Sequence, residues 1–252
     1  MAGRGGQDLS APDFGLLAAE YDRLRPADEQ WREVFEALVQ EGGLAGTRRI
    51  LDVGCGTGTV AAELAALGAR VWGIDPSREM LEVARAKAPR GVGLKEGRAE
   101  ELLFKDGWFD RVVYSLVVHL VDRPRAFMEA RRVLAPGGRV AIATFDPVHF
   151  GRYYLGHLFP SIERIDLARF PDEEALRAEL EAAGFTPPTV RRLHQEDEIS
   201  REEALRRIRA RHISTFQLIG EEEYRAGLER AERELPAVVR VTRDFLVVAA
   251  ER

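Results

Sequence analysis

The stretch Leu51-Asp52-Val53-Gly54-Cys55-Gly56-Thr57-Gly58 decides the fold of this chain. Its apolar start, from Ile50, predicts a buried strand, and glycines then occupy every second position. Because glycine has no Cβ, such a turn lets the backbone pass very close to a ligand. The segment from Thr59 to Gly68 predicts a helix, whose first N–H groups lack partners within the helix. The pattern is therefore that of a strand, a ligand-binding turn and a helix.

A carboxylate follows at the end of the next predicted strand, Val71 to Asp75. Ligands of open α/β sheets bind at the carboxyl ends of parallel strands. Asp75 can accept hydrogen bonds there from two ribose hydroxyls. The two strand ends together predict a nucleoside site, and they count against a tight turn that binds nothing.

The main rival nucleoside is NAD, whose fingerprint is G-x-G-x-x-G. Counted from Gly54, the sixth position is Thr59, and the third glycine comes one place early at Gly58. The acidic Asp52, just before the glycines, also suits a ligand that carries an ammonium group. The spacing therefore disfavours a dinucleotide.

Short apolar runs alternate with amphipathic stretches over residues 47–145, which is typical of stacked βαβ units and a parallel sheet. Ser77 and Asp122 are expected helix caps. Strands are expected over residues 50–53, 71–75, 92–96, 109–120 and 139–145. The region 149–165 looks irregular and aromatic-rich, and a helix over 172–184 and a strand over 189–193 follow. A capping box at Ser200 opens a charged helical segment that Pro236 ends, before a last strand region over 238–249.

Several sequence blocks occur in one order along residues 21–145: Tyr21-Asp-Arg-Leu-Arg-Pro26, Gly54–Gly58, Gly73-Ile-Asp-Pro-Ser77 with Met80-Leu81, Glu96–Glu100, Phe109-Asp-x-Val112 and Leu134–Gly138. In these blocks the chain resembles the class I methyltransferases that use S-adenosylmethionine (SAM), nearest to the UbiE-like small-molecule group, methyltransferase type 11. The resemblance covers half of the chain. It is specific for the fold and the cofactor but not for the substrate.

The resemblance implies an α/β fold, a Rossmann-like doubly wound sheet of seven strands whose last strand is antiparallel, with a helical lid insertion. It divides the chain into an N-terminal arm, residues 1–29, and a SAM-binding core, residues 30–199 and 237–252. The insertion, residues 200–236, is expected to lie over the active site.

The resemblance also implies which residues bind the methionine part of SAM. Asp52 is expected to face its ammonium group, and Ser115 to lie near its backbone. Tyr21 would cover the cofactor and Arg25 would pair with its carboxylate; the alternative is an ordinary helix that packs its tyrosine on the core. The glycines expected to line this part are Gly54, Gly56 and Gly58.

The nucleoside part of SAM has its own implied contacts. Asp75 would take the ribose hydroxyls, and Met80 or Pro76 would pack on the adenine. Ala99 would offer its backbone to the adenine ring, and Glu100 would accept from the exocyclic amine.

His119 is the candidate general base, because it follows the fourth strand and the ordinary histidine pKa of ~6.5 suits proton transfer near neutrality. The alternative is that it packs against the cofactor or shapes the acceptor pocket. No metal is required for methyl transfer. Further candidates for an acceptor pocket are His149, Tyr153, Tyr154, His157, His212, Ser214, Thr215 and Phe216.

These patterns predict a SAM-dependent methyltransferase that acts on a small molecule at O, N or C. The alternatives are an RNA or protein methyltransferase and a SAM-binding regulator without catalysis. A net charge of −5, with both signs mixed along the chain, argues against a nucleic-acid partner. The acceptor and the oligomeric state stay open.

The rest of the composition bears on disulfides, zinc sites and the cellular location of the protein. Its single cysteine excludes an internal disulfide framework and a cysteine-based zinc site. No membrane span or secretory signal is apparent, so we expect a cytoplasmic protein. The chain contains no asparagine and only three lysines, which fits either a thermophile or a GC-rich genome.

Overall fold

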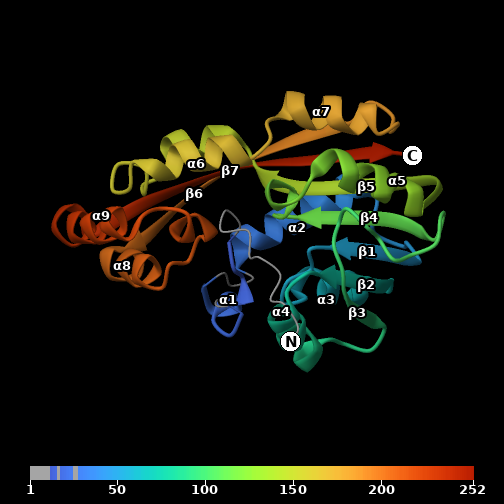
Figure 1. The fold of residues 1–252 in the computed structure, drawn as a ribbon, viewed down its shortest axis with the longest axis horizontal. Coiled ribbons are helices and arrows are strands. Elements are labelled where there is room, and N and C mark those ends of the chain that lie inside the picture. Colours follow the sequence, from blue (N-terminus) through green and yellow to red (C-terminus); the bar gives the residue numbers. More distant parts are fainter. Residues whose placement is uncertain (1–11, 16–17, 25–27) are drawn as a thin grey trace, which may run out of the picture.

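The computed structural model describes residues 12–15, 18–24 and 28–252. Its sheet has seven strands in the order β3-β2-β1-β4-β5-β7-β6, and β7 runs antiparallel to both of its neighbours (Figure 1). This arrangement confirms the predicted fold. The strands are β1 Arg49–Val53, β2 Arg70–Asp75, β3 Val92–Glu96, β4 Phe109–Ser115, β5 Leu134–Phe145, β6 Thr189–Ser200 and β7 Val238–Glu251.

Helices cover both faces of the sheet (Figure 1). They are α1 Tyr21–Leu24, α2 Glu29–Gly42, α3 Thr59–Ala66, α4 Arg78–Lys87, α5 Arg123–Val133, α6 Ser161–Arg169, α7 Glu173–Ala182, α8 Arg201–Arg209 and α9 Glu221–Glu234. Successive strand residues point to opposite faces. Val112 and Tyr114 of β4 therefore pack in the cluster that includes α5 and α7, whereas Val113 packs with α2 and α3.

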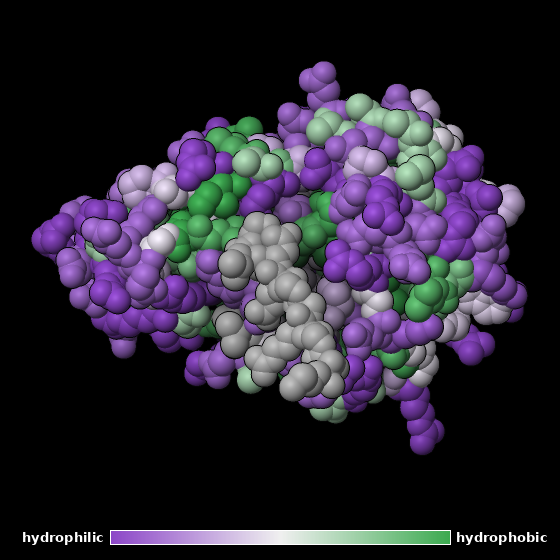
Figure 2. Space-filling model, in the orientation of Figure 1, coloured by the Kyte–Doolittle hydropathy of each residue, from purple (hydrophilic) through white to green (hydrophobic). Residues whose placement is uncertain are grey.

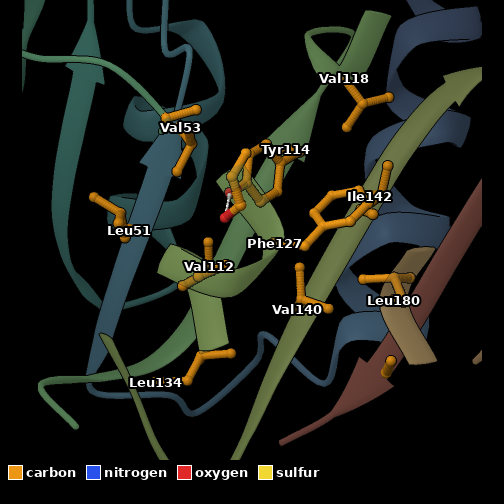
Figure 3. Close-up of a cluster of buried hydrophobic side chains, with 14 of the residues drawn as sticks. Leu51, Val53, Val112, Tyr114, Val118, Phe127, Leu134, Val140, Ile142 and Leu180 are labelled. Carbon is orange, nitrogen blue, oxygen red and sulfur yellow. Dashed lines mark hydrogen bonds between the residues drawn. The ribbon is translucent and has the colours of Figure 1, made fainter. Parts of the chain in front are cut away.

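Tyr114 shows how this core accepts a polar group. Its side chain is fully buried among apolar neighbours such as Phe127 and Ile142 (Figure 3). Its hydroxyl donates to the backbone carbonyl of Ala126 at 3.0 Å, which is the partner that a buried hydroxyl needs. The bond ties β4 to the start of α5, directly after the segment that carries His119.

The expected caps begin their helices. Ser77, Asp122 and Ser200 each accept a hydrogen bond from the backbone N–H three residues further on. At Ser200 the capping box is formed only in this direction, because the carboxylate of Glu203 pairs with arginines of its own helix, at 2.7 Å and 2.6 Å.

Four elements differ from the sequence expectations. Strand β4 ends at Ser115 rather than residue 120, because Leu116 has a positive φ of 53° and a 3-10 turn, Val118–Leu120, follows. The region expected to be irregular contains α6, which has no apolar stripe because one of its two buried residues is Asp166. Strand β5 begins at Leu134 rather than residue 139, across a register shift against β4. Strand β6 continues to Ser200, because its charged residues pair along the whole length of β7 at the sheet edge.

A separate cluster of buried residues lies where β6 ends and β7 begins. It joins the segment 154–162, which leads into α6, to α8 and α9, which follow one another between the two strands. Figure 1 shows these helices grouped beyond the end of the sheet. Most of the face in Figure 2 is hydrophilic, and apolar residues reach it over α6. Within the described residues, no helix is long and apolar enough to cross a membrane.

Gly227 allows α9 to pack tightly in this cluster, because a Cβ there would lie 2.2 Å from the ring of Phe159. We expect Gly227→Ala to lower the free energy of unfolding by about 1–2 kcal/mol, since overpacking outweighs the roughly 1 kcal/mol that alanine gains in a helix. Urea unfolding measures this change. The control Gly220→Ser, at the cap of the same helix where a Cβ meets open space, should be as stable as the wild type. Undiminished stability of Gly227→Ala would contradict this packing.

Candidate functional site

A cavity of about 970 Å³ opens at the carboxyl ends of β1, β2 and β4 and continues to the helices at the end of β6 and β7. This volume is at the upper end of the roughly 300–1,000 Å³ found for small-molecule sites. The wall contains ten of the predicted site residues: Tyr21, Gly54, Gly56, Asp75, Pro76, Met80, Ala99, Glu100, Ser115 and His119. Asp52 and Gly58 are not part of the wall. Arg25 lies outside the described residues.

The register of the parallel strands creates this convergence. Val53 pairs with Ile74 of β2 on one side and with Tyr114 of β4 on the other. The residues that follow these three lie side by side at the carboxyl ends of the strands, so the glycine turn, Asp75 and Ser115 meet at one edge of the sheet. Strands about 20 to 60 residues apart along the chain therefore build one site.

The three glycines of the turn have different surroundings. A Cβ on Gly54 would lie 2.4 Å from Val117, so this glycine is required by packing. Gly58 begins α3, and a Cβ there would lie 3.1 Å from the Cβ of Ala84. Only Gly56 combines a place in the cavity wall with open space where a Cβ would project, at a positive φ of 52°. The space beside Gly56 is where a ligand can approach the backbone.

Asp75 holds this turn in place. One carboxylate oxygen accepts from the N–H of Gly56 and the other from the N–H of Ser77, both at 2.9 Å. Burial raises the pKa of Asp75, and these two hydrogen bonds oppose the rise. A carboxylate oxygen can accept more than one hydrogen bond, so both oxygens can still receive ligand hydroxyls.

Asp52 lies beneath the turn and is 1% exposed. Burial, together with the nearby charge of Asp75, raises its pKa to about 7. Its Oδ2 atom has no hydrogen-bond partner in the described part of the chain. A cation bound at the turn would favour the ionised form of both carboxylates. The open space beside Gly56 and the carboxylate of Asp75 thus fit a nucleoside, and Asp52 adds a buried acidic group behind the turn, outside the cavity wall.

The expected adenine contacts form another part of the wall. Met80 and Ala99 are buried there. Glu100 already has partners: its Oε1 accepts from the N–H of Asp122 at 2.9 Å, and its Oε2 lies 3.4 Å from Arg98. Its role toward an exocyclic amine stays a prediction.

Helix α1 is held beside the glycine turn by residues to which the sequence analysis gave no role. Asp22 accepts from the hydroxyl of Thr57 at 2.5 Å and pairs with Lys87. This holds α1 beside the turn, with Tyr21 in the cavity wall. Asp22 belongs to the sequence block that begins at Tyr21. The family resemblance, however, implies no ligand contact for Asp22.

His119 lies in a single 3-10 turn after β4, and its ring stacks on Phe170 at 3.9 Å between centroids. Residues from the later half of the chain, Phe170 among them, line the part of the cavity next to His119. His149, Tyr153, Tyr154, His212, Ser214 and Thr215 also line that part, whereas His157 does not. Phe216 is fully buried against Phe159 and Tyr224, at 4.9 Å and 5.6 Å, so it does not face the cavity.

Several other residues that line this part of the cavity were not predicted from the sequence, because no motif marks them. They come from the last strands, from α6 and from α8, and they include Phe145, Asp166, Gln195, Arg207, Arg243 and Phe245. Their sequence surroundings are those of ordinary charged strands and helices.

Comparisons with known proteins agree with this geometry. Residues 51–142 match the family model described as a methyltransferase domain. A demethylmenaquinone methyltransferase of Thermus thermophilus is 34% identical over 203 residues, which cover 69% of this chain and 91% of that protein. The enzyme of the same name from Clavibacter sepedonicus is 34% identical over 71% of this chain and 83% of its own length. An uncharacterized methyltransferase of Mycobacterium tuberculosis is 40% identical over 136 residues, so the chain matches about half (53%) of its length.

Solved structures show the same fold. A putative methyltransferase from an antibiotic biosynthesis pathway of Anabaena variabilis has a TM-score of 0.66 at 23% identity, covering 86% of this chain and 96% of its own. A phosphoethanolamine N-methyltransferase of Haemonchus contortus, solved with SAM, has a TM-score of 0.62 at 20% identity and covers 98% of this chain and 60% of its own. The fold is thus that of a class I methyltransferase. The chain belongs to the methyltransferase family that includes the demethylmenaquinone methyltransferases.

Gly56→Val places a branched side chain in the open space beside the turn. We expect it to weaken SAM binding by at least tenfold, because the side chain occupies the ligand's space, while the fold stays intact. Gly107→Val is the matched control, since Gly107 also has a positive φ (65°) and open surroundings but is not in the cavity wall. It should lose similar stability and bind SAM normally by calorimetry. If folded Gly56→Val binds SAM normally, this glycine serves only the conformation of the turn.

Asp52 should make the stability of the ligand-free protein depend on pH. Its pKa is raised from 3.8 to about 7, so the folded protein keeps a proton that the unfolded chain has released. The contribution of Asp52 to the free energy of unfolding therefore falls as the pH rises from 5 to 8, and it opposes the gain from His149, whose pKa burial lowers to about 4. Asp52→Asn should reduce this fall by about 1–3 kcal/mol, at 1.36 kcal/mol per pKa unit. Urea unfolding at the two pH values tests it, with the exposed Glu222→Gln as a control. An unchanged fall in Asp52→Asn would contradict the assignment.

Proposed function

We propose that this protein transfers a methyl group from SAM to a small-molecule acceptor by direct displacement. The observation that carries the proposal is the carboxylate of Asp75, held by two backbone N–H groups beside the open space at Gly56. This arrangement suits a ribose whose attached methionine part reaches across the turn toward buried Asp52. The family supports SAM as the cofactor.

Bound SAM would supply a methyl group that its sulfonium has already activated. The task of the chain is then to align the acceptor with that methyl group and to exclude water. Asp75 and the turn would hold the ribose and methionine parts, with Ser115 near the methionine backbone. Tyr21 would close the site from the side of the arm.

His119 is the residue that we propose as general base, for acceptors that must lose a proton. Its stacking on Phe170 fixes the plane of the imidazole ring within the cavity wall, to which both residues belong. The same contact also suits the alternative, in which His119 only shapes the acceptor pocket. His119→Gln separates the two roles, because loss of a base changes the pH profile of turnover and loss of shape does not.

We further propose that residues 30–199 and 237–252 form the core and that residues 1–29 act as an arm beside it. Residues 200–236 would act as a lid over the acceptor part of the cavity, which is the part that the later half of the chain lines. Support comes from His212, Ser214 and Thr215, which lie between α8 and α9 and line the cavity. The relatives named for demethylmenaquinone favour a small-molecule acceptor over RNA or protein. A SAM-binding regulator without catalysis is the second candidate, and turnover separates the two.

The test of the proposed function is calorimetry with SAM, its product S-adenosylhomocysteine (SAH) and NAD, followed by a metabolite screen with methyl-labelled SAM. We expect SAM and SAH to bind, NAD not to bind, and label to appear in a small molecule. Binding of NAD without SAM would overturn the proposal. SAM binding without any transfer would favour the regulator.

Asp75→Ala should weaken SAM binding by roughly ten- to hundredfold. Each hydrogen bond to a charged group contributes roughly 1.5–3 kcal/mol at most, and 1.4 kcal/mol is about tenfold in affinity. Calorimetry measures the change, with Asp13→Ala as a control on the cavity rim outside the turn. Unchanged affinity in folded Asp75→Ala would show that this carboxylate does not hold the ribose.

A further inference from the structure

Arg243 of β7 is a mostly buried cation in the wall of the acceptor part of the cavity, with a side chain that is 17% exposed. Its Nη1 atom is buried and has no hydrogen-bond partner in the described residues. Its one ion pair in that part of the chain is long, 3.8 Å from Nη2 to Oδ2 of Asp197. Guanidinium stays charged and offers five donors. A buried cation with so little compensation indicates a site for an anion.

Two more polar atoms without partners lie near this guanidinium. They are the hydroxyl of Tyr154 and Nδ1 of His149, both buried and both belonging to residues of the same wall. The charge of Arg243 acts on both groups: it opposes the rise in the pKa of Tyr154 that burial causes, and it adds to the fall in the pKa of His149. Native proteins leave few buried polar groups unpaired, so these atoms together are expected to contact a ligand.

The other charges at this end are compensated within the protein. Arg207 lies 2.6 Å from Glu203 on its own helix. Asp166 accepts from the hydroxyl of Thr215 at 2.7 Å and lies 3.4 Å from Arg169. Among these three charged groups of the described chain, Arg243 is the one that is left to meet an anionic ligand.

Aromatic rings flank the same region. Phe145 is stacked between Phe245, at 4.5 Å, and His149, at 4.6 Å, and all three line the cavity. Tyr153 lies 4.8 Å from His149 and also lines it. Such walls favour a planar apolar body, with a few polar groups to fix its orientation.

We infer that the acceptor of this protein is an aromatic molecule with an anionic oxygen group, and that Arg243 binds this group within the aromatic wall. A carboxylate has the required chemistry, because it can meet the guanidinium with two hydrogen bonds. The inference rests on the proposed function, because it takes this part of the cavity as the acceptor site.

The experiment uses matched probes of equal shape and different charge: 2-naphthoate against 2-naphthamide, and benzoate against benzamide. Their binding to the full chain saturated with SAH is measured by calorimetry. We expect each carboxylate to bind at least tenfold more tightly than its amide in the wild type. Arg243→Gln should abolish this preference, and Arg243→Lys should keep part of it. Arg240→Gln, an exposed position on the same strand, should keep all of it.

SAH affinity is the reference in every variant, because it reports the other end of the cavity and the integrity of the fold. Equal binding of carboxylates and amides, binding of neither, or a preference that persists in Arg243→Gln with normal SAH affinity would overturn the inference and leave the methyltransferase function standing. Loss of SAH binding by the wild type would instead overturn the proposed function. Methylation of anionic aromatic acceptors, with a rise in KM rather than a fall in kcat on Arg243→Gln, would support it further.

Discussion

The hydrogen bonds from Gly56 and Ser77 to Asp75 are the interaction on which the site depends. They join the turn after β1 to the end of β2, so the position of the turn is set by a carboxylate on a different strand. The same N–H groups hold that carboxylate in one orientation despite its burial. A ligand that contacts the turn therefore meets a preorganised acceptor of hydrogen bonds, without a loop having to order first.

This arrangement carries an electrostatic cost in the ligand-free protein. Asp52 and Asp75 are both buried, and each is harder to ionise than an exposed aspartate; Asp52 is affected further by the charge of Asp75. The balance changes when a positively charged ligand binds, since the cation then favours both charged forms. A cationic ligand would therefore reduce the electrostatic cost of keeping these two carboxylates buried.

The other end of the cavity has the opposite character. It is walled by aromatic rings and carries the unpaired donor of Arg243, and its residues come from β5, β7, the segment after β5 and the helices between β6 and β7. The core of the helical group is separate from the two clusters that flank the sheet. The two ends of the cavity are therefore built by different parts of the chain, each with its own packed core.

Sequence patterns alone were enough to predict the sheet, the turn and ten of the residues that line the cavity. Strand β3 was expected with the observed bounds, and ten of the predicted site residues meet in one wall, because their motifs lie at strand ends and strand ends of a parallel sheet converge. Helix α6 was not expected because buried Asp166 interrupts its apolar face, and the length of β6 was not expected because pairing with β7 overrides its charged composition. The different roles of Gly54, Gly56 and Gly58 depend on the side chains that surround each glycine in the fold, and the motif does not specify these neighbours. Only the tertiary structure brought Arg243, Tyr154 and His149 together, since side chains from distant segments become one site through packing rather than through any local pattern.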